Sequence, residues 1–220
     1  MINTTITSVG SNMFEAAVFG KQQFYKEHPE AEGKMNITVL DSGTYTLGYG
    51  YPIVEASKMI KAGRSAEEIT AWLDDFYATV EIIFAAYSLE YARKSGRIPA
   101  ASAFVGDVLG LRPIISIVDG VTTVVEKVRG DRNVVPHIVD YAYGRAVDKK
   151  APTAVICGSV EQYGEDIYKA VAKKFGHAPK ARYLAGASIA INSGPKVAGV
   201  IVRGEKRINT RAREQDFIRG

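Results

Sequence analysis

An Asp-Gly pair between two apolar runs constrains the fold of this chain more than any other local feature. The runs are residues 113–118 and 121–128, and Asp119-Gly120 joins them. An Asp-Gly pair is typical of the tight turn of an antiparallel β-hairpin, in which both central residues need a positive φ angle. The sequence therefore predicts a hairpin here.

Short apolar runs alternate with helical segments through the rest of the chain, and this alternation predicts an α/β fold. The expected strands are residues 36–40, 80–86, 153–157, 187–191 and 197–202, with the end of a further strand at 4–7. The expected helices are residues 12–27, 52–61, 65–76, 132–147 and 162–175. Ser65 and Glu68 have the spacing of a capping box, and Pro52 is expected near the first turn of its helix. The polar tail after Arg203 is expected to fray.

The composition narrows the possible classes of protein. A single cysteine, Cys157, excludes an internal disulfide framework and fits a reducing cytosol, so we expect a cytoplasmic protein. Cys157 lies in the apolar run T-A-V-I-C-G and is expected in the core. No apolar run reaches the roughly 18 residues of a membrane span, and the first residues lack the pattern of a signal peptide. The net charge of +4 permits an acidic partner but does not indicate nucleic acid.

Residues for catalysis or metal binding do not gather in the sequence. His28 and His177 stand near prolines, and His137 lies within an apolar helical segment. No Ser-His-Asp or Cys-His arrangement emerges, and no spacing of metal ligands is present. Residues 40–50 contain glycines after a strand but lack both nucleotide-binding glycine patterns. We therefore expect no catalytic residue, no metal and no cofactor.

Two loops that follow strands carry small polar residues. In I-T-S-V-G-S-N-M-F-E-A-A, residues 6–17, Ser11 or Asn12 stands at the start of a helix. The N–H groups of a first turn and the helix dipole favour an anion there, so a carboxylate or phosphate would suit this position. The alternative is that Ser11 only caps its own helix. The second loop, residues 41–50, is by itself typical of a tight turn before a helix.

Three sequence blocks, in this order, resemble the DegV family. S-L-E-Y-A-R-K-S-G-R-I at 88–98 resembles the family pattern S-L-E-Y-L-x-x-G-G-R-I. G-L-R-P-I-I at 110–115 resembles L-N-I-K-P-I-L, and E-K-V-R at 126–129 resembles G-K-x-R. The resemblance extends from about residue 6 to about residue 202, and it implies a protein that binds fatty acids.

The resemblance also implies an anchor for the carboxylate of the lipid. Residues 6–17 resemble the family signature S-S-x-L-S-G-T-Y-Q-S-A. In the family the Ser that heads S-G-T contacts the carboxylate, and it corresponds to Ser11. Asn12 and Ser8 are its neighbours in this anchor. In the closing pattern G-x-x-I-x-x-H-x-G-P-G-A-x-G-V, the family's His corresponds to Asn192, which can donate a hydrogen bond but carries no charge.

Two further sets of residues follow from the resemblance. The loop at 41–50 resembles the family's D-S-x-x-x-S-x-G-x-G, and its expected ligand residues are Asp41, Ser42 and Thr46. Cations at strand ends and turns would form one positive rim that meets a partner kinase or the phosphate of its product: Arg97, Arg112, Lys127, Arg129 and Arg132. The alternative for these cations is a solvated surface.

The family fold implies two α/β parts. Residues 1–76 would be a reduced N-terminal domain, and residues 77–220 a C-terminal domain with a mixed or antiparallel sheet and a charged tail. The family's opening T-S-x-P-S loop has no counterpart in this sequence. We expect either a truncated chain or a diverged short form.

The implied function is non-covalent binding of a long-chain fatty acid in a tunnel between the two parts. The bound carboxylate would be presented to a separate ATP-dependent fatty acid kinase, so the chain would be a binding subunit and not an enzyme. Two other functions stay open. One is an enzyme for a small carboxylate or phosphate that uses the Ser11 and Asp41 loops, and the other is a regulatory module that binds a protein through the cationic rim. Nucleic acid binding and stable membrane insertion are not expected.

Overall fold

The chain forms two compact units, Met1–Ala78 with Lys206–Gly220, and Thr79–Glu205, which we call the first and the second unit. The computed structural model describes residues 1–96, 110–151, 153–208 and 211–217. The division expected from the sequence placed residues 77–220 together. The structure differs at the tail, because the residues after 205 make their contacts with the first unit. Within the described ranges, no helix has the length and apolar character that crossing a membrane requires.

A two-stranded parallel sheet is the centre of the first unit. Strand β1 (Ile2–Thr5) pairs with β2 (Thr38–Asp41). Helix α1 (Met13–Glu27) and the 3-10 turn η1 (Pro29–Ala31) connect the two strands, so this segment is a βαβ unit. The core between α1 and the sheet consists of four buried residues: Phe14, Val18, Ile37 and Val39.

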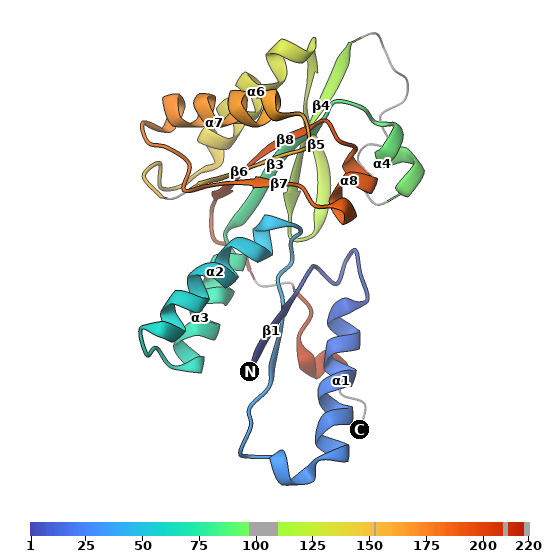
Figure 1. The fold of residues 1–220 in the computed structure, drawn as a ribbon, viewed down its shortest axis with the longest axis vertical. Helices are drawn as coiled ribbons and strands as arrows, with labels where there is room; N and C mark the ends of the chain where they lie inside the picture. Colours follow the sequence, from blue (N-terminus) through green and yellow to red (C-terminus); the bar gives the residue numbers. More distant parts are fainter. Residues whose placement is uncertain (97–109, 152, 209–210, 218–220) are drawn as a thin grey trace. The chain divides into compact units, whose positions relative to one another are not determined.

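Helices α2 (Leu47–Lys61) and α3 (Ala66–Tyr77) lie on the other side of the sheet from α1 (Figure 1). The predicted capping box opens α3: the Ser65 hydroxyl accepts the Glu68 N–H at 3.2 Å, and the Glu68 carboxylate accepts the Ser65 N–H at 2.9 Å. The prediction for α2 was wrong at its start, because the helix begins at Leu47 and Pro52 lies inside it. Pro52 is buried there, so packing offsets the hydrogen bond that its missing N–H removes.

The second unit contains a six-stranded mixed sheet in the order β5-β4-β3-β8-β6-β7. Only β6 and β7 pair in parallel, and the other neighbours are antiparallel. This agrees with the expected mixed sheet. The strand bounds are Val80–Ala86 for β3, Leu111–Val118 for β4, Val121–Arg129 for β5, Ala154–Cys157 for β6, Ala181–Leu184 for β7 and Val197–Arg203 for β8.

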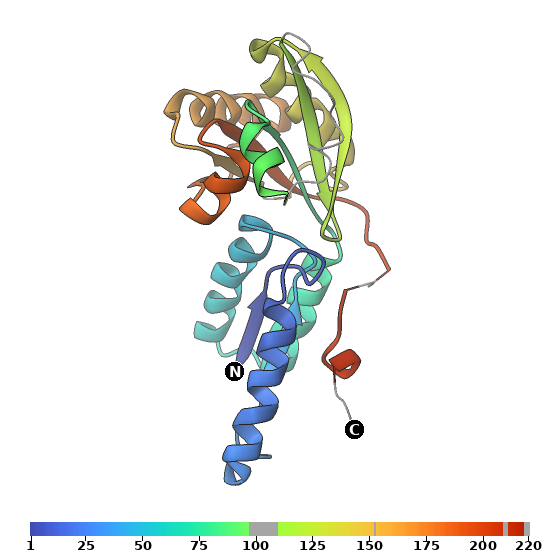
Figure 2. The same cartoon turned by 90° about the vertical axis from the view of Figure 1, so that its right-hand side faces the viewer.

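Strands β4 and β5 form the predicted hairpin, seen at the edge of the sheet in Figure 2. The turn residues have positive φ angles, 49° at Asp119 and 77° at Gly120. A pair of positive φ angles gives the turn a twist that matches the flanking strands, and asparagine, aspartate and glycine tolerate it best. The local turn chemistry was therefore sufficient to locate the hairpin.

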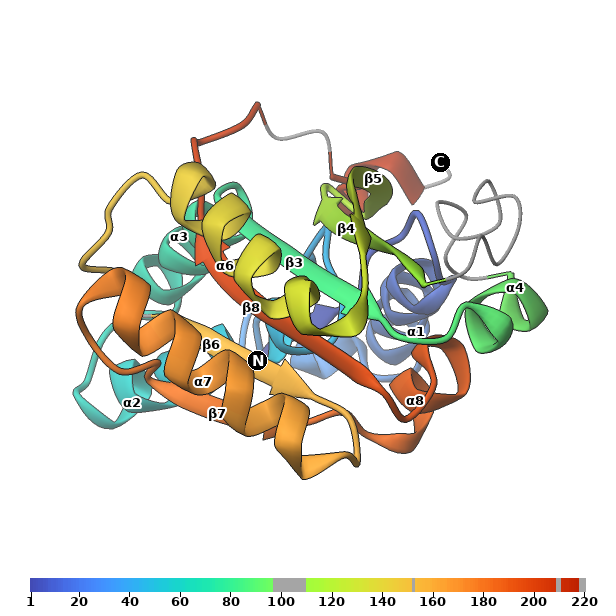
Figure 3. The same ribbon diagram turned by 90° about the horizontal axis from the view of Figure 1, so that it is seen from above.

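Two helices cover one face of this sheet. Helix α6 (Val134–Arg145) and α7 (Glu161–Phe175) lie side by side across the strands in Figures 1 and 3. Gly176 ends α7 in the left-handed conformation, which glycine adopts without steric cost. The core under the helices is mostly aliphatic and includes Ile83, Ile114, Ile138, Ile167 and Val200. The 3-10 turn η2 (Asp131–Asn133) leads into α6.

Two sequence predictions were wrong in or after the second unit, and one strand was missed. Residues 187–191 are not a strand: they belong to helix α8 (Ala187–Ser193), which packs against α4 (Glu90–Ser95). Strand β7 was not foreseen, because its residues alternate between half-buried and exposed and carry no long apolar run. The tail does not fray over its described residues, which include the 3-10 turn η3 (Glu214–Phe217) and contacts with the first unit.

Candidate functional site

The loop between β1 and α1 is a compact turn in the first unit. Thr7 is fully buried, donates its N–H to the Thr44 carbonyl at 2.9 Å, and accepts the Val9 N–H on its hydroxyl at 3.2 Å. Gly10 lies against the ring of Tyr45, so close that a Cβ atom at this position would lie 2.1 Å from the Tyr45 hydroxyl. A larger residue at position 10, such as the leucine of the family signature, would require the Tyr45 ring to lie elsewhere.

Ser11 caps the helix that follows it. Its hydroxyl accepts the Met13 N–H at 3.2 Å, whereas the Asn12 side chain makes no capping hydrogen bond. This hydrogen bond agrees with the capping interpretation from the sequence. A serine hydroxyl that accepts one hydrogen bond still has its own proton to donate. Ser11 is half-buried and Asn12 is exposed, and a role for either in carboxylate binding stays a prediction.

Asp41 holds the loops of the first unit together. It is 5% exposed and accepts four hydrogen bonds: from the Ser8 N–H at 3.2 Å and the Gly43 N–H at 2.9 Å on Oδ1, and from the Ser8 hydroxyl at 2.6 Å and the Ala212 N–H at 3.3 Å on Oδ2. Both carboxylate oxygens of Asp41 are thus hydrogen-bonded to other groups of the chain. Ser8 donates its single hydroxyl proton to Asp41, so in this arrangement it positions the loop.

The loop after β2 contains one hydroxyl that the sequence did not single out. Ser42 is fully buried and closes a local turn, since its hydroxyl accepts the Thr44 N–H at 3.3 Å. Thr44 is only 2% exposed, and its hydroxyl oxygen has no hydrogen-bond partner among the described residues. A buried hydroxyl without a partner is costly, which marks Thr44 as a group that a ligand could satisfy.

Thr46, the residue at the second Ser position of the family loop, has an unusual backbone. Its φ angle is +46° and its ψ angle is −122°, at the position that precedes α2. A β-branched residue rarely adopts a positive φ, so this position stores strain of about 1–3 kcal/mol. Strained residues concentrate where loops must be held in one shape, and this supports a functional role for the loop that contains Thr46.

Asn192 belongs to the second unit. It lies in α8 and donates its side-chain N–H to the Ser188 carbonyl of the same helix at 2.7 Å. Its expected place at the end of a strand is therefore corrected to the last turn of a short helix. The side-chain oxygen of Asn192 can still accept a hydrogen bond, and its contact with a carboxylate stays a prediction.

The cations of the predicted rim do not share one face of the sheet. Arg112 lies opposite Val128, which faces α6, and it forms an ion pair with Asp131 at 2.9 Å. Lys127 and Arg129 flank Val128 along β5, and alternation of side chains directs them to the opposite face, where both are exposed. Arg97 lies outside the described residues.

Other titratable groups are placed in the core. Cys157 is buried, as predicted, and burial raises the pKa of its thiol. Tyr87 stacks on Tyr163 with ring centroids 4.1 Å apart, and burial raises the pKa of the Tyr87 phenol.

Over the part of the chain that the structure describes, His, Cys, Asp and Glu form no group that could hold a metal ion. A shallow groove along α1 is lined by Phe19, Gly20, Gln22, Gln23 and Lys26, none of them a predicted site residue.

Sequence comparison finds a family model and several related proteins that match most of this chain. The model of the DegV family matches residues 1–205. A DegV domain-containing protein from Caldanaerobacter subterraneus subsp. tengcongensis is 28% identical over 201 residues, which cover 91% of this chain and 69% of the relative. A DegV domain-containing protein from Clostridium acetobutylicum is 28% identical over 204 residues, with the same two shares.

Solved structures share the fold at low sequence identity. A stearic-acid-binding protein from Eubacterium ventriosum gives a TM-score of 0.79 at 23% identity and covers 92% of this chain and 70% of its own. A fatty-acid-binding DegV protein from Thermus thermophilus gives 0.73 at 23%, with shares of 93% and 70%. The fatty acid kinase B3 protein of Streptococcus pneumoniae, loaded with linoleic acid, gives 0.80 at 16%, with shares of 93% and 71%.

Proposed function

We propose that this chain, which belongs to the DegV family, binds a long-chain fatty acid non-covalently and does not transform it. Solved proteins of the same fold bind stearic and linoleic acid. Among the residues of the chain, the proposal depends on an apolar face of the six-stranded sheet. Hydroxyl groups of the first unit provide the proposed anchor for the carboxylate.

The apolar face is the observation that carries the proposal. The register aligns Ile82 with Ile117 and Ile201, and Phe84 with Ile115. Residues paired across neighbouring strands have their side chains on the same face. Ile83, next to Ile82 in β3, belongs to the core under α6 and α7, so these residues lie on the opposite face. The members of the face are aliphatic or aromatic and all are buried: Ile82, Phe84, Ile115, Ile117, Ile156 and Ile201.

The hydrocarbon supplies most of the expected affinity. A chain with about 15 methylenes contributes on the order of 12 kcal/mol when it is fully removed from water, at about 0.8 kcal/mol each. Association removes roughly 4–15 kcal/mol of this. Useful affinity therefore needs nearly complete burial of the chain, and the carboxylate contacts mainly fix its direction. The interdomain tunnel that the family resemblance implies stays a prediction.

We propose Ser11 and Thr44 as donors to the carboxylate. Ser11 retains a proton to donate after it accepts the Met13 N–H, and the buried Thr44 hydroxyl has no partner among the described residues. Asn12 follows Ser11, and Thr46 lies two residues after Thr44. Asn192 is the proposed contact in the second unit. Asp41, Ser8 and Ser42 take part indirectly, because their hydrogen bonds shape the loops that carry the donors.

Lipid extraction and binding measurements test this function. Protein purified from cells is examined by native mass spectrometry, and its lipid is extracted and identified. We expect a fatty acid at close to one per chain, and delipidated protein should bind palmitate again. Neither bound lipid nor palmitate binding would contradict the proposal. Protection of the fold by a small anion, in protein without lipid, would then favour the enzyme alternative.

A substitution at Thr44 distinguishes a ligand donor from a structural residue. Thr44→Val removes the hydroxyl and keeps the shape, so the free protein should be as stable as wild type or more stable. Affinity for palmitate should fall by about 1–3 kcal/mol, the cost of one lost hydrogen bond to a buried group. Ser11→Ala should weaken binding by a similar amount, and it also removes the exposed acceptor of the Met13 N–H, which should cost less than about 1 kcal/mol of stability. The matched control is Ser57→Ala, an exposed serine whose hydroxyl bonds to the Val54 carbonyl of its own helix. Unchanged palmitate affinity in both site variants would refute these anchors.

We further propose that the bound carboxylate is offered to a separate ATP-dependent kinase, with Lys127 and Arg129 at the contact. Both are exposed on the same face of the edge strand β5. Charge reversal of both residues should weaken a salt-sensitive association with the kinase and leave palmitate binding intact. Equal association of wild type and variant, measured at low and high salt, would rule this surface out.

A further inference from the structure

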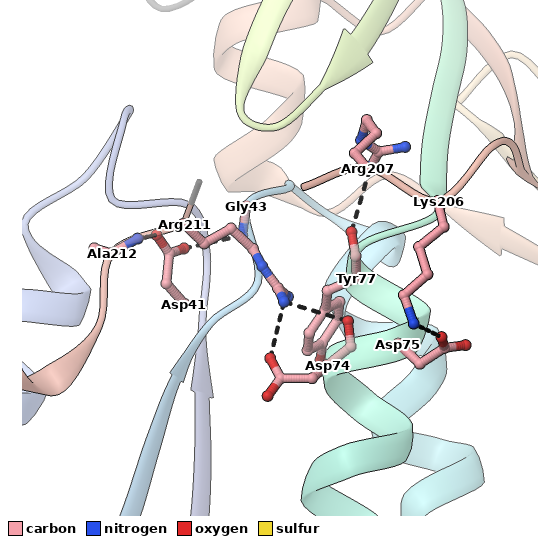
Figure 4. Close-up of polar contacts among 9 residues, drawn as sticks. All are labelled: Asp41, Gly43, Asp74, Asp75, Tyr77, Lys206, Arg207, Arg211 and Ala212. Atoms are coloured by element: carbon pink, nitrogen blue, oxygen red, sulfur yellow. Dashed lines mark hydrogen bonds and ion pairs between the residues drawn. The ribbon is translucent and has the colours of Figure 1, made fainter. Parts of the chain in front are cut away.

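The C-terminal segment, residues 206–208 and 211–217, is held on the first unit at four places, and we call it the strap. It contacts the end of α3, the Asp41 side chain, the edge of β2 and helix α1 (Figure 4 shows the first two). The DegV family model ends at residue 205, so the strap lies beyond the matched region. Family membership therefore does not account for it.

The strap supplies charges that the end of α3 lacks. The last turn of α3 contains Asp74 and Asp75 and no basic residue, although the C-terminal end of a helix dipole favours cations. In the strap, Lys206 pairs with Asp75 at 2.7 Å. Arg207 donates its N–H to the Ala78 carbonyl at 3.0 Å and its guanidinium to the Tyr77 carbonyl at 3.2 Å. The helix end and the strap are thus complementary in charge and in hydrogen bonding.

Arg211 is the most deeply buried contact of the strap. Its side chain is only 4% exposed, and its Nη2 donates to the Asp74 carboxylate at 2.8 Å and to the Asp74 carbonyl at 3.2 Å. The guanidinium also lies 5.6 Å from the centre of the Tyr77 ring (Figure 4). A buried guanidinium is stable only with such partners, so these contacts fix the strap at Arg211.

The residue after Arg211 reaches the loops of the candidate site. Ala212 donates its N–H to Asp41 Oδ2, and Asp41 in turn accepts the N–H groups of Ser8 and Gly43. The position of Arg211 therefore sets the position of a donor that contacts Asp41. Through Asp41, the strap is connected to both loops in which the proposed carboxylate donors lie.

Glu214 continues the attachment beyond Ala212. Its carboxylate accepts the Val39 N–H at 2.6 Å and forms an ion pair with Lys21 of α1. In β2, Thr38 donates its N–H toward β1, so alternation directs the Val39 N–H to the other edge of the strand. Glu214 satisfies this edge group, and Ala212 packs on the core between α1 and the sheet.

From these contacts we propose that the strap fixes the loops at residues 7–12 and 41–46 in their ligand-binding arrangement, with Arg211 as the positioning residue. The effect of the strap on ligand affinity rests on the proposed function. The effect of the strap on the loops does not, because the hydrogen bonds to Asp41 are all made by groups of the chain itself. Loss of Arg211 should release Ala212 from Asp41 and loosen the hydrogen bonds of Ser8 and Gly43.

Hydrogen exchange of the full chain tests the loops directly. In Arg211→Gln the amides of Ser8 and Gly43 should exchange roughly tenfold faster than in wild type, as expected for loss of a charged hydrogen bond. The Glu68 amide, which bonds to Ser65 at the start of α3, is the internal reference and should change less. Lys206→Gln removes an exposed ion pair of the same segment and should leave all three amides within about twofold of wild type.

Palmitate affinity is measured on the same variants. Arg211→Gln should raise the palmitate Kd by roughly tenfold, and Arg211→Lys, which keeps the charge, should recover most of this loss. If Arg211→Gln does not fold, Asp74→Asn removes the partner at a half-exposed position and should change the same amides in the same direction. Unchanged exchange at Ser8 and Gly43 in the Arg211 or Asp74 variant would overturn the strap proposal. Failure of wild type to bind palmitate would instead refute the proposed function, and the exchange data would still decide the role of the strap.

Discussion

Arg145 and Glu81 form a two-point ion pair in the second unit. The guanidinium Nε lies 2.8 Å from Glu81 Oε2, and Nη2 lies 2.6 Å from Oε1. Glu81 is completely buried at the start of β3, whereas Arg145 is the last residue of α6. The hydrogen bonds with Glu81 raise the pKa of the Arg145 guanidinium. The pair therefore joins the end of a helix to the central strands of the sheet.

Arg145→Ala should destabilise the protein by about 1–3 kcal/mol, because it removes the two hydrogen bonds that Arg145 donates to a fully buried carboxylate. Urea unfolding followed by circular dichroism measures the change. The control is Lys169→Ala, which breaks an exposed pair with Glu165 along α7 and should cost less than about 0.5 kcal/mol. Equal effects of the two substitutions would show that the Glu81 pair contributes no more than a surface contact.

Two glycines of the second unit should respond to alanine in opposite directions. A Cβ atom on Gly158 would lie 1.8 Å from the Pro195 carbonyl oxygen, a backbone atom that cannot move aside cheaply. Gly158→Ala should therefore cost about 1–3 kcal/mol. Gly144 lies within α6 with nothing near its missing Cβ, so Gly144→Ala should stabilise by about 0.5–1 kcal/mol. Melting temperatures of the two variants that shift in the same direction would contradict this prediction.

Cys157 should react slowly in the native protein. Burial raises the pKa of its thiol, so a smaller fraction is the reactive thiolate at any pH below that value, and the sulfur is also shielded. Iodoacetamide at pH 8 should label the protein much faster in urea than in buffer. Mass spectrometry reads the result without ambiguity, since the chain has one cysteine. Rapid labelling in buffer would show that β6 opens readily.

The capping box of α3 should contribute measurably to stability. Ser65→Ala removes the acceptor for the Glu68 N–H and should cost about 1 kcal/mol. Chemical denaturation gives the value, and Ser57→Ala, at an exposed position inside α2, should change stability by less than about 0.5 kcal/mol. A loss below that of the control would mean that the helix end frays without penalty.

The sequence predicted the elements whose turn or helix start is set by neighbouring residues. The Asp119-Gly120 turn located β4 and β5, and Ser65 with Glu68 located the start of α3. Residues 187–191 were misassigned because a short run of small and branched apolar residues suits either a strand or a helix. Their packing against α4, which the sequence does not display, decided for the helix.

The candidate site was predictable only in part, for the same reason. The sequence singled out the two loops and Ser11, whose contact with a carboxylate stays a prediction. It did not indicate that the Asp41 carboxylate would accept hydrogen bonds from Ser8, Gly43 and Ala212. Ala212 is 171 positions from Asp41 in the sequence. Arg211 looked like one more cation of a polar tail, and its burial against Asp74 follows from tertiary packing alone. The Thr44 hydroxyl, which has no hydrogen-bond partner in the part of the chain that the structure describes, is likewise a property of the folded loop.

The attachment of Glu214 to Lys21 and Val39 has a consequence for the order in which the chain can fold as it is made. These contacts join positions 193 and 175 residues apart, so the first unit stays incomplete until the ribosome has added residue 214. All of residues 79–205 have been translated by then. The part of the protein that is synthesised first therefore receives these stabilising contacts only after the second unit has been made.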